Sequence, residues 1–449
     1  MVEEILKGNL KNGEKAPSKR VLSSHLKVSQ NTVETAYELL VAEGYLKAIT
    51  RSGFYVCTPD DCLQPINNSA VSYEEEEEEI TDDDINYKYN FGTNVVDTNF
   101  FPYSTWTKIV KEITTYNRNL LNHGHPQGDL CLREAIKNYL HEFRGMSCSP
   151  DQIIVGAGVE YLIGLIVQIL GKNCTIGFEN PGYYKSYNII TNNNINIDLI
   201  DLDENGLKVD KLEQSNANVA YITPSHQFPT GVIMPIGRRI QLLNWANTSD
   251  SRYIIEDDYD SEFRFNGRPI PTLQSLDLNN KVIYLSTFSK SIAPSIRIAY
   301  MVLPKSMLAL YKKNFSFYSS TVSRFEQHCL YKFIQDGHFS RHLNKMKNIY
   351  RTRKDKLVDA LKNSKGKELI TIIGENTGLH LLITVDNGMN EDELIKSAKQ
   401  AGVKLYGLSK YYIKDNGNIP KATVVLGYSG FEPEELFNAV KALENAWFS

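Results

Sequence analysis

The segment Tyr284–Tyr300, with the sequence YLSTFSKSIAPSIRIAY, decides the fold of this chain. It leads from an apolar stretch, typical of a β-strand, into a hydroxyl-rich turn that holds Lys290, and Arg297 follows. A lysine amine can form an imine, while Thr287, Ser289 and Arg297 can bind phosphate oxygens. Together these residue types indicate a pyridoxal phosphate (PLP) site. A short motif alone is more often a solvated lysine at a strand end, so the remaining sequence has to decide.

Three segments upstream support the PLP interpretation. Tyr253–Asp260 (YIIEDDYD) is predicted to be a buried strand ending in carboxylates, and a carboxylate there can pair with a protonated pyridine nitrogen. Thr223–Gly231 (TPSHQFPTG) and Glu179–Tyr183 (ENPGY) precede it. In this order and spacing the four segments resemble the aminotransferase-like PLP proteins of fold type I. In their residues they resemble the MocR type of GntR-family transcription regulators, and the resemblance covers nearly the whole chain.

This resemblance implies a role for individual residues. Lys290 would hold the cofactor as an imine, and Asp257 would bind its pyridinium nitrogen. Tyr259 would contact the phenolic oxygen, Tyr183 the face of the ring, and Arg297 the phosphate. We therefore expect a fold-type-I domain that binds PLP at the carboxyl ends of its strands.

A further phosphate contact is predicted nearer the N-terminus. Residues 153–158 (IIVGAG) indicate a strand that runs into a turn of small residues, and the apolar helix predicted for 159–170 follows. Free backbone N–H groups and the helix dipole make such a helix start an anion site. Alone, the pattern is more often a packing turn. Ahead of the lysine-bearing turn, it predicts phosphate binding by Ala157, Gly158 and Val159.

Residues 1–56 are predicted to form a winged helix-turn-helix domain. Ser18 and Ser29 stand where N-caps belong, each ahead of an amphipathic stretch, and residues 42–56 supply two short strands around the tip Thr50–Gly53. Ala16–Arg20, Asn31–Val33 and Ala42–Leu46 resemble the GntR-family DNA-binding domain. The alternative is a small helical docking module.

Six side chains of this domain are predicted to contact operator DNA. Gln30, Asn31 and Thr32 at the second helix start are placed to meet base edges. Lys19, Arg20 and Arg51 are placed to meet phosphates. The family usually has arginine at the position of Gln30, and glutamine pairs more naturally with adenine than with guanine.

The charge is divided unevenly along the chain. The net charge of −4 is the sum of +2 for residues 1–56, −11 for residues 57–87 and +5 for the remainder. The middle segment holds the run Glu74–Glu79 and has no Lys or Arg, so it predicts an extended acidic linker. The alternative is a DNA mimic that competes for the wing. The overall acidity therefore does not exclude nucleic-acid binding by the first domain.

Residues 88–449 are predicted to form the PLP domain. Strand patterns alternate with helical patterns, which indicates an α/β fold with a mostly parallel sheet, and a smaller α+β subdomain is predicted from Thr371 onward. Six Cys and nine His are too scattered for a disulfide framework or a metal site. With no signal sequence and no run long enough for a bilayer, we expect a soluble cytoplasmic protein with no membrane partner.

Enzyme and regulator remain to be distinguished. Enzymes of this kind grip the substrate carboxylate with an arginine at the start of the last strand, where this chain has Val425. Lys185 and Lys410 are possible point-charge substitutes, and Phe228 stands where enzymes have Asn. We therefore predict a transcription regulator that senses PLP itself to control vitamin B6 synthesis. The alternatives are a sensor of an amino acid bound to PLP and an active aminotransferase.

The resemblance also predicts the assembly. Fold-type-I cofactor sites resemble sites built from two subunits, so we expect a homodimer. Each winged helix would then meet one half-site of a double-stranded operator.

Overall fold

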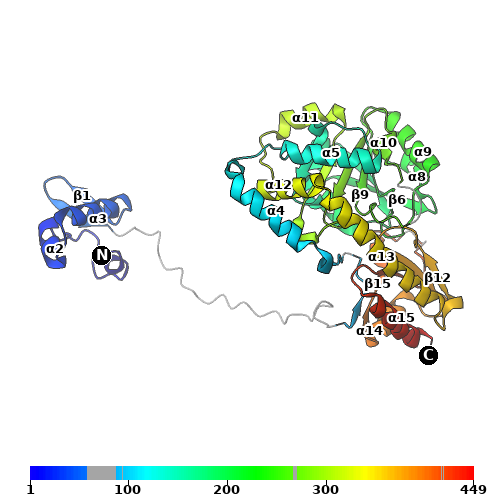
Figure 1. Ribbon diagram of the computed structural model, residues 1–449. Helices are drawn as coiled ribbons and strands as arrows, with labels where there is room; N and C mark the ends of the chain where they lie inside the picture. The colour runs from blue at the N-terminus through cyan, green and yellow to red at the C-terminus, as the bar shows by residue number, and fades with distance from the viewer. Residues whose placement is uncertain (58–86, 94, 266–269, 416, 418, 449) are drawn as a thin grey trace. The chain divides into compact units, whose positions relative to one another are not determined.

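The computed structural model describes residues 1–57, 87–93, 95–265, 270–415, 417 and 419–448. The chain divides into two compact units, Met1–Ile85 and Asn86–Ser449, each drawn in Figure 1. The acidic linker predicted for residues 57–87 lies outside the described residues, apart from Cys57 and Tyr87.

The N-terminal unit has the predicted winged helix-turn-helix fold. Its elements are α1 (Val2–Leu6), α2 (Lys19–Leu26), α3 (Gln30–Ala42), β1 (Leu46–Ile49) and β2 (Gly53–Val56), with the two strands antiparallel. Helices α2 and α3 begin after Ser18 and Ser29, because each serine oxygen accepts a backbone N–H of the first turn. A small apolar core holds the unit together: Ile5, Ala16, Val33, Tyr37, Leu46 and Val56.

Among the described residues, the large unit is built on an eight-stranded sheet in the order β4-β11-β10-β9-β8-β5-β6-β7. The strands are β4 (Ile153–Gly156), β5 (Thr175–Asn180), β6 (Asn196–Asp203), β7 (Gly206–Leu207), β8 (Val219–Ile222), β9 (Tyr253–Asp258), β10 (Val282–Thr287) and β11 (Ala299–Val302). The pairs from β10 through β9, β8 and β5 to β6 are parallel, whereas the edge pairs are antiparallel. The prediction of a mostly parallel sheet is confirmed.

Helices cover both faces of this sheet, as Figure 1 shows. One face packs against α6 (Val159–Leu170), α7 (Tyr184–Asn192) and α11 (Lys305–Phe315). The other packs against α4 (Tyr103–Tyr116), α5 (Leu130–Arg144), α8 (Val209–Gln214), α9 (Ile236–Asn247), α10 (Leu273–Leu276) and α12 (Arg324–Gln335). The central strands are buried on both faces and read as continuous apolar runs, which is typical of parallel sheets.

The long helix α13 (His338–Lys362) leads into the smaller subdomain. Four strands, β12 (Ile370–Ile373), β13 (His380–Val385), β16 (Thr423–Gly427) and β15 (Tyr406–Gly407), pair antiparallel in that order. Helices α14 (Glu391–Gln400) and α15 (Pro433–Trp447) complete it, in agreement with the predicted α+β tail.

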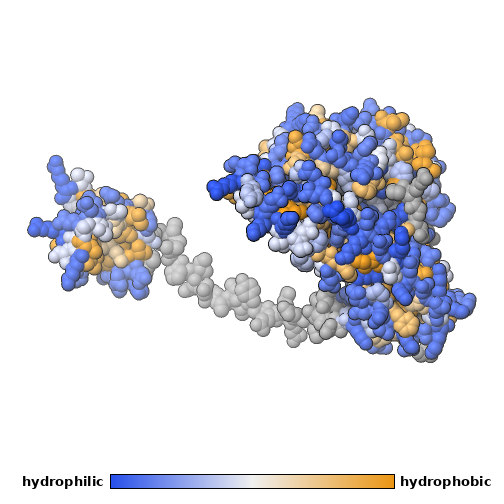
Figure 2. All heavy atoms as spheres, in the orientation of Figure 1, coloured by the Kyte–Doolittle hydropathy of each residue, from blue (hydrophilic) through white to orange (hydrophobic). Residues whose placement is uncertain are grey.

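On the face of the large unit drawn in Figure 2, hydrophilic side chains predominate and apolar ones form small separate patches. Within the described parts of the chain, no helix is both long and apolar enough to cross a membrane.

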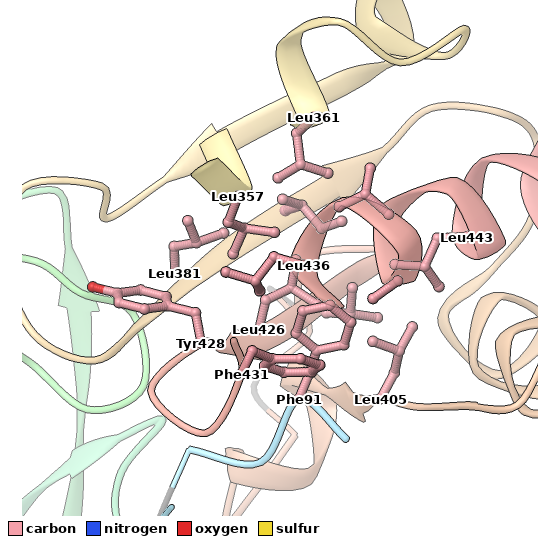
Figure 3. Packing of buried hydrophobic residues seen from close by; sticks show 14 of the residues in the cluster. Phe91, Leu357, Leu361, Leu381, Leu405, Leu426, Tyr428, Phe431, Leu436 and Leu443 are labelled. Carbon is pink, nitrogen blue, oxygen red and sulfur yellow. The ribbon is translucent and has the colours of Figure 1, made fainter. Parts of the chain in front are cut away.

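One part of the small subdomain was not predicted. Residues 87–93 and 95–97, named here the entry segment, follow the linker. They pack against the C-terminal part of the large unit. Strand β3 (Tyr89–Asn90) pairs in parallel with β14 (Val403–Lys404), and the Gly427 N–H donates to the Phe91 carbonyl at 2.9 Å. Figure 3 shows Phe91 beside Phe431, and the two rings are 4.7 Å apart. A two-residue strand has too little sequence pattern to be recognised.

Candidate cofactor site and DNA interface

A cavity of the large unit lies where the central parallel strands end. Its volume is about 910 Å³, including the solvent-filled mouth. Side chains reach it from the carboxyl ends of β8, β9 and β10 and from the first turns of α6 and α7. Open α/β sheets bind their ligands at this position.

Most of the residues predicted to bind the cofactor line this cavity: Val159, Tyr183, Asp257, Tyr259, Thr287, Ser289, Lys290 and Arg297. Ala157 does not line it, and its backbone N–H donates to Thr321 Oγ1 at 3.0 Å. Gly158 does not line the cavity either, and its backbone N–H donates to the Gly156 carbonyl at 2.9 Å. Phosphate binding by Ala157, Gly158 and Val159 therefore stays a prediction.

Lys290 lies just after β10, and its amine points to the entry segment. The Nζ atom donates to the Thr93 carbonyl at 3.1 Å. Burial lowers the pKa of Lys290 to about 8, Asp260 opposes that shift, and Lys185 adds to it. An appreciable fraction of the amine is therefore neutral near neutral pH, as a nucleophile for an aldehyde requires.

Asp257 stands at the end of β9 with one oxygen engaged and one not. Its Oδ2 accepts from the Tyr221 hydroxyl, whereas its buried Oδ1 has no hydrogen-bond partner within the described part of the chain. Burial raises the pKa of Asp257 to about 7, against the effect of the Tyr221 bond. A buried acceptor without a donor costs about 1–3 kcal/mol, so a ligand N–H at Oδ1 would remove that cost. The site fits a protonated pyridine nitrogen.

The cavity also carries anion-binding groups, at the start of α6. Arg297 is bonded through Nη2 to Glu160 Oε2 at 2.8 Å. Gly158, the N-cap of α6, has φ of 97°, and a Cβ there would lie 2.5 Å from Arg297 Nη2. Glycine is therefore required for the guanidinium to approach the helix start. Thr287 and Ser289 also line this cavity, so the donor types that a phosphate needs are present.

A buried polar cluster extends the site beyond Tyr259. The Tyr259 hydroxyl and His226 Nδ1 are 2.9 Å apart, and His226 Nδ1 is also 2.9 Å from Asp260 Oδ2. His380 donates from Nε2 to the Pro229 carbonyl at 2.9 Å, and burial holds its pKa well below the usual value. His226 belongs to the quoted segment 223–231 and could have been noticed there, but nothing in the sequence marks His380.

An aromatic wall closes the side of the cavity towards the small subdomain. The Tyr183 ring meets the Phe228 ring edge-to-face at 5.3 Å, and Phe228 also contacts Tyr411 at 5.1 Å. Burial raises the pKa of Tyr183 to about 12, so its hydroxyl stays protonated. Val425 lies beyond this wall in β16, where it is fully buried beside Leu382. It does not line the cavity.

The lysines suggested as substitutes for the missing arginine differ in position. Lys185 is exposed in the first turn of α7 and lines the cavity. Lys410 does not line it. Lys185 is therefore the one of the two within reach of a ligand.

The N-terminal unit presents its predicted DNA contacts unequally. Gln30, Asn31 and Thr32 are exposed in the first turn of α3, as are Arg20 on α2 and Arg51 between the wing strands. Lys19 is engaged within the unit, because its amine is paired with the Glu34 carboxylate and lies 5.4 Å from the centre of the Phe54 ring. The Lys19 charge is therefore partly neutralised before any phosphate arrives.

A winged helix-turn-helix joined to an aminotransferase fold defines a class of transcription regulators. Residues 1–56 match the model of the bacterial regulatory proteins of the gntR family, and residues 87–420 match that of aminotransferase class I and II. The chain belongs to the MocR-type, PLP-dependent regulators of the GntR family, which confirms the predicted family, fold and class of cofactor.

Several relatives match almost end to end, among them the following three. The uncharacterized HTH-type transcriptional regulator YdeL of Bacillus subtilis is 40% identical, over 99% of this chain and 94% of its own length. The probable rhizopine catabolism regulatory protein MocR of Rhizobium meliloti is 31% identical, over 99% and 92%. The pyridoxine biosynthesis transcriptional regulator PdxR of Corynebacterium glutamicum is 30% identical, over 96% and 91%.

Solved aminotransferase structures share the fold of the large unit. The kynurenine aminotransferase of Pyrococcus horikoshii, in complex with PMP, has a TM-score of 0.69 at 24% identity, over 81% of this chain and 91% of that one. An archaeal alanine:glyoxylate aminotransferase has a TM-score of 0.72 at 21% identity, over 82% and 92%.

Proposed function

We propose that this regulator senses PLP itself and controls genes of vitamin B6 synthesis. The proposal rests on our assignment of Val425 to the position of the carboxylate-binding arginine, and it is supported by the full burial of Val425 beside Leu382 and Leu408. A cavity that lacks this arginine is suited to recognising the cofactor rather than an amino acid.

Each part of the cofactor has a proposed partner in the cavity. The Asp257 Oδ1 atom would accept the pyridinium N–H, and the Tyr259 hydroxyl would face the phenolic oxygen. Tyr183 would cover the ring face. The phosphate would be held by Thr287, Ser289, Arg297 and the helix start at Gly158 and Val159. Bound PLP would supply the aldehyde with which the Lys290 amine condenses.

Amino acids would bind this cavity weakly. The cations that line it, among the described residues, are Lys185, Lys290 and Arg297, and we assign the last two to the cofactor. Lys185 offers a mobile point charge, not the fixed fork of a guanidinium. Each charged hydrogen bond lost with the fork is worth about 1.5–3 kcal/mol, which weakens binding by roughly tenfold or more. The same loss disfavours turnover as an aminotransferase.

The relatives leave both kinds of effector open. PdxR is named for pyridoxine biosynthesis, which supports sensing of the vitamin, whereas MocR is named for rhizopine catabolism. Their identities to this chain, 30% and 31%, are nearly equal. Lys185 is the observation that favours the second candidate, a regulator that senses an amino acid bound to PLP.

We further propose that the protein acts as a homodimer on operator DNA. Two winged helices would then meet two half-sites, through Gln30, Asn31 and Thr32 on the bases and through Arg20 and Arg51 on the phosphates. Cofactor binding would change the population of dimers whose two DNA-binding units suit the half-site spacing.

The test combines a spectral titration with DNA binding. Cofactor-free protein is titrated with PLP while its imine band is followed, and operator affinity is measured with and without PLP. We expect a change in operator affinity with PLP alone and no spectral response to D- or L-amino acids or γ-aminobutyrate below millimolar concentration. A clear shift with one amino acid, together with DNA binding that ignores PLP alone, would establish the amino-acid sensor instead.

A further inference from the structure

Glu160 brings a negative charge to the end of the cavity where the phosphate would bind. It stands in the first turn of α6, lines the cavity, and accepts from Arg297 Nη2 at 2.8 Å. A Cβ on Gly158 would lie 2.5 Å from that nitrogen and 2.8 Å from Glu160 Oε2, so both side chains lie directly over the helix start. A carboxylate thus already uses the guanidinium at a helix N-terminus that attracts anions.

The Glu160 carboxylate is ionised at neutral pH. Burial raises its pKa, but its own backbone N–H, the Arg297 bond and the charges of Arg297 and Lys185 outweigh burial and leave the pKa below its usual value. A phosphate seated between Gly158 and Arg297 would therefore have to displace this carboxylate or lie beside it. Either event opposes binding of a doubly charged anion.

We propose that Glu160 sets the affinity for the cofactor: its carboxylate competes with the PLP phosphate for Arg297 and keeps binding reversible. This inference rests on the proposed function, because a protein that reports the free PLP concentration must exchange its ligand. A permanently occupied site would report nothing about supply. Glu160 acts through phosphate alone, since its partner is the predicted phosphate ligand.

A positioning role for Glu160 predicts the opposite change in PLP affinity. If Glu160 served to position Arg297 for phosphate, its removal would weaken PLP binding. If it competes, its removal tightens PLP binding by roughly tenfold, the effect expected when one charge-assisted hydrogen bond becomes available to the phosphate. The direction of the change separates the two roles.

The test uses the full-length protein and the variant Glu160→Gln, which keeps the size of the side chain and removes its charge. The Glu160 and Arg297 side chains are 45% and 53% exposed, so the pair contributes little to stability and the variant should fold. Glu112→Gln is the matched control, because Glu112 also pairs with a cation, Lys332, but does not line the cavity. Thermal unfolding checks all three proteins.

Two aldehydes are titrated while the imine band is followed: PLP and pyridoxal, which has the same ring and aldehyde without the phosphate. We expect Glu160→Gln to lower the Kd for PLP about tenfold, to leave pyridoxal binding unchanged, and Glu112→Gln to change neither. An unchanged or weaker PLP affinity, or an equal change for pyridoxal, would overturn the proposal.

A separate measurement distinguishes failure of this inference from failure of the proposed function. If neither protein forms an imine with PLP, the proposed function is refuted, and inorganic phosphate then becomes the probe. Competition by Glu160 predicts that phosphate raises the Tm of Glu160→Gln more than that of the unaltered protein. An equal or smaller rise would refute the competition as well.

Discussion

Reaction of Lys290 with PLP should accelerate as the pH is raised, and it should level off near pH 8. Only the neutral amine attacks an aldehyde, and burial lowers the pKa of Lys290 to about 8. At pH 7 such an amine is roughly 10% neutral, against about 0.03% for an ordinary lysine with a pKa near 10.5, a ratio of roughly 300. The rate should therefore rise about tenfold per pH unit below the midpoint and be flat above it.

Stopped-flow mixing of cofactor-free protein with PLP, from about pH 6 to pH 10, measures this profile through the imine band. Two substitutions should move the midpoint in opposite directions. Lys185→Ala removes a charge that lowers the pKa of Lys290, so the midpoint should rise, whereas Asp260→Asn removes one that raises it, so the midpoint should fall. A midpoint close to that of free lysine, or the reverse order of the two variants, would show that the Lys290 environment has been misassigned.

The other predictions concern the cofactor, the fold and DNA. Lys290→Ala should abolish the borohydride-reducible imine while thermal unfolding stays cooperative; an imine that persists would place the reactive lysine elsewhere. Gly158→Ala should weaken PLP binding by tenfold or more, because φ is 97° and the added Cβ would meet Arg297 Nη2 at 2.5 Å; an unchanged Kd would show that the guanidinium is free to move. Arg51→Ala should reduce the slope of log affinity against log salt by about one, and Lys19→Ala by less because Glu34 already pairs with it; equal slopes would contradict the difference. Sedimentation of the PLP-bound protein should give a homodimer, and a stable monomer would rule out a paired-half-site mode of DNA binding.

Much of the fold could be predicted because its signals are local. Ser18 and Ser29 cap the helices they were expected to cap, since N-cap chemistry depends on residues within one turn. Lys290 and Asp257 are brought together by parallel strands whose carboxyl ends meet at one edge of the sheet, which alternating strands and helices already indicate. The site residues on these strand ends could therefore be predicted from the sequence.

The features that could not be predicted depend on contacts between segments far apart in the sequence, or on the orientation of a single side chain. The Thr93 carbonyl accepts from Lys290, 197 residues away, and no local pattern encodes such a pair. Ala157 carries a backbone donor of the expected kind, but Thr321 from a distant loop already uses it. Glu160 reads as an ordinary acidic residue in a first helical turn until the structure shows the partner it meets there.

The entry segment also determines the order in which the protein can become functional while it is being made. The Ser429 hydroxyl donates to the Val95 carbonyl, 334 positions away, so this contact of the entry segment cannot form until Ser429 has been synthesised. The winged helix ends at Val56, and at about 5–20 residues per second the residues from there to Ser429 take roughly 20–75 seconds to synthesise. A nascent chain therefore carries the complete winged helix-turn-helix before the entry segment can bond to Ser429.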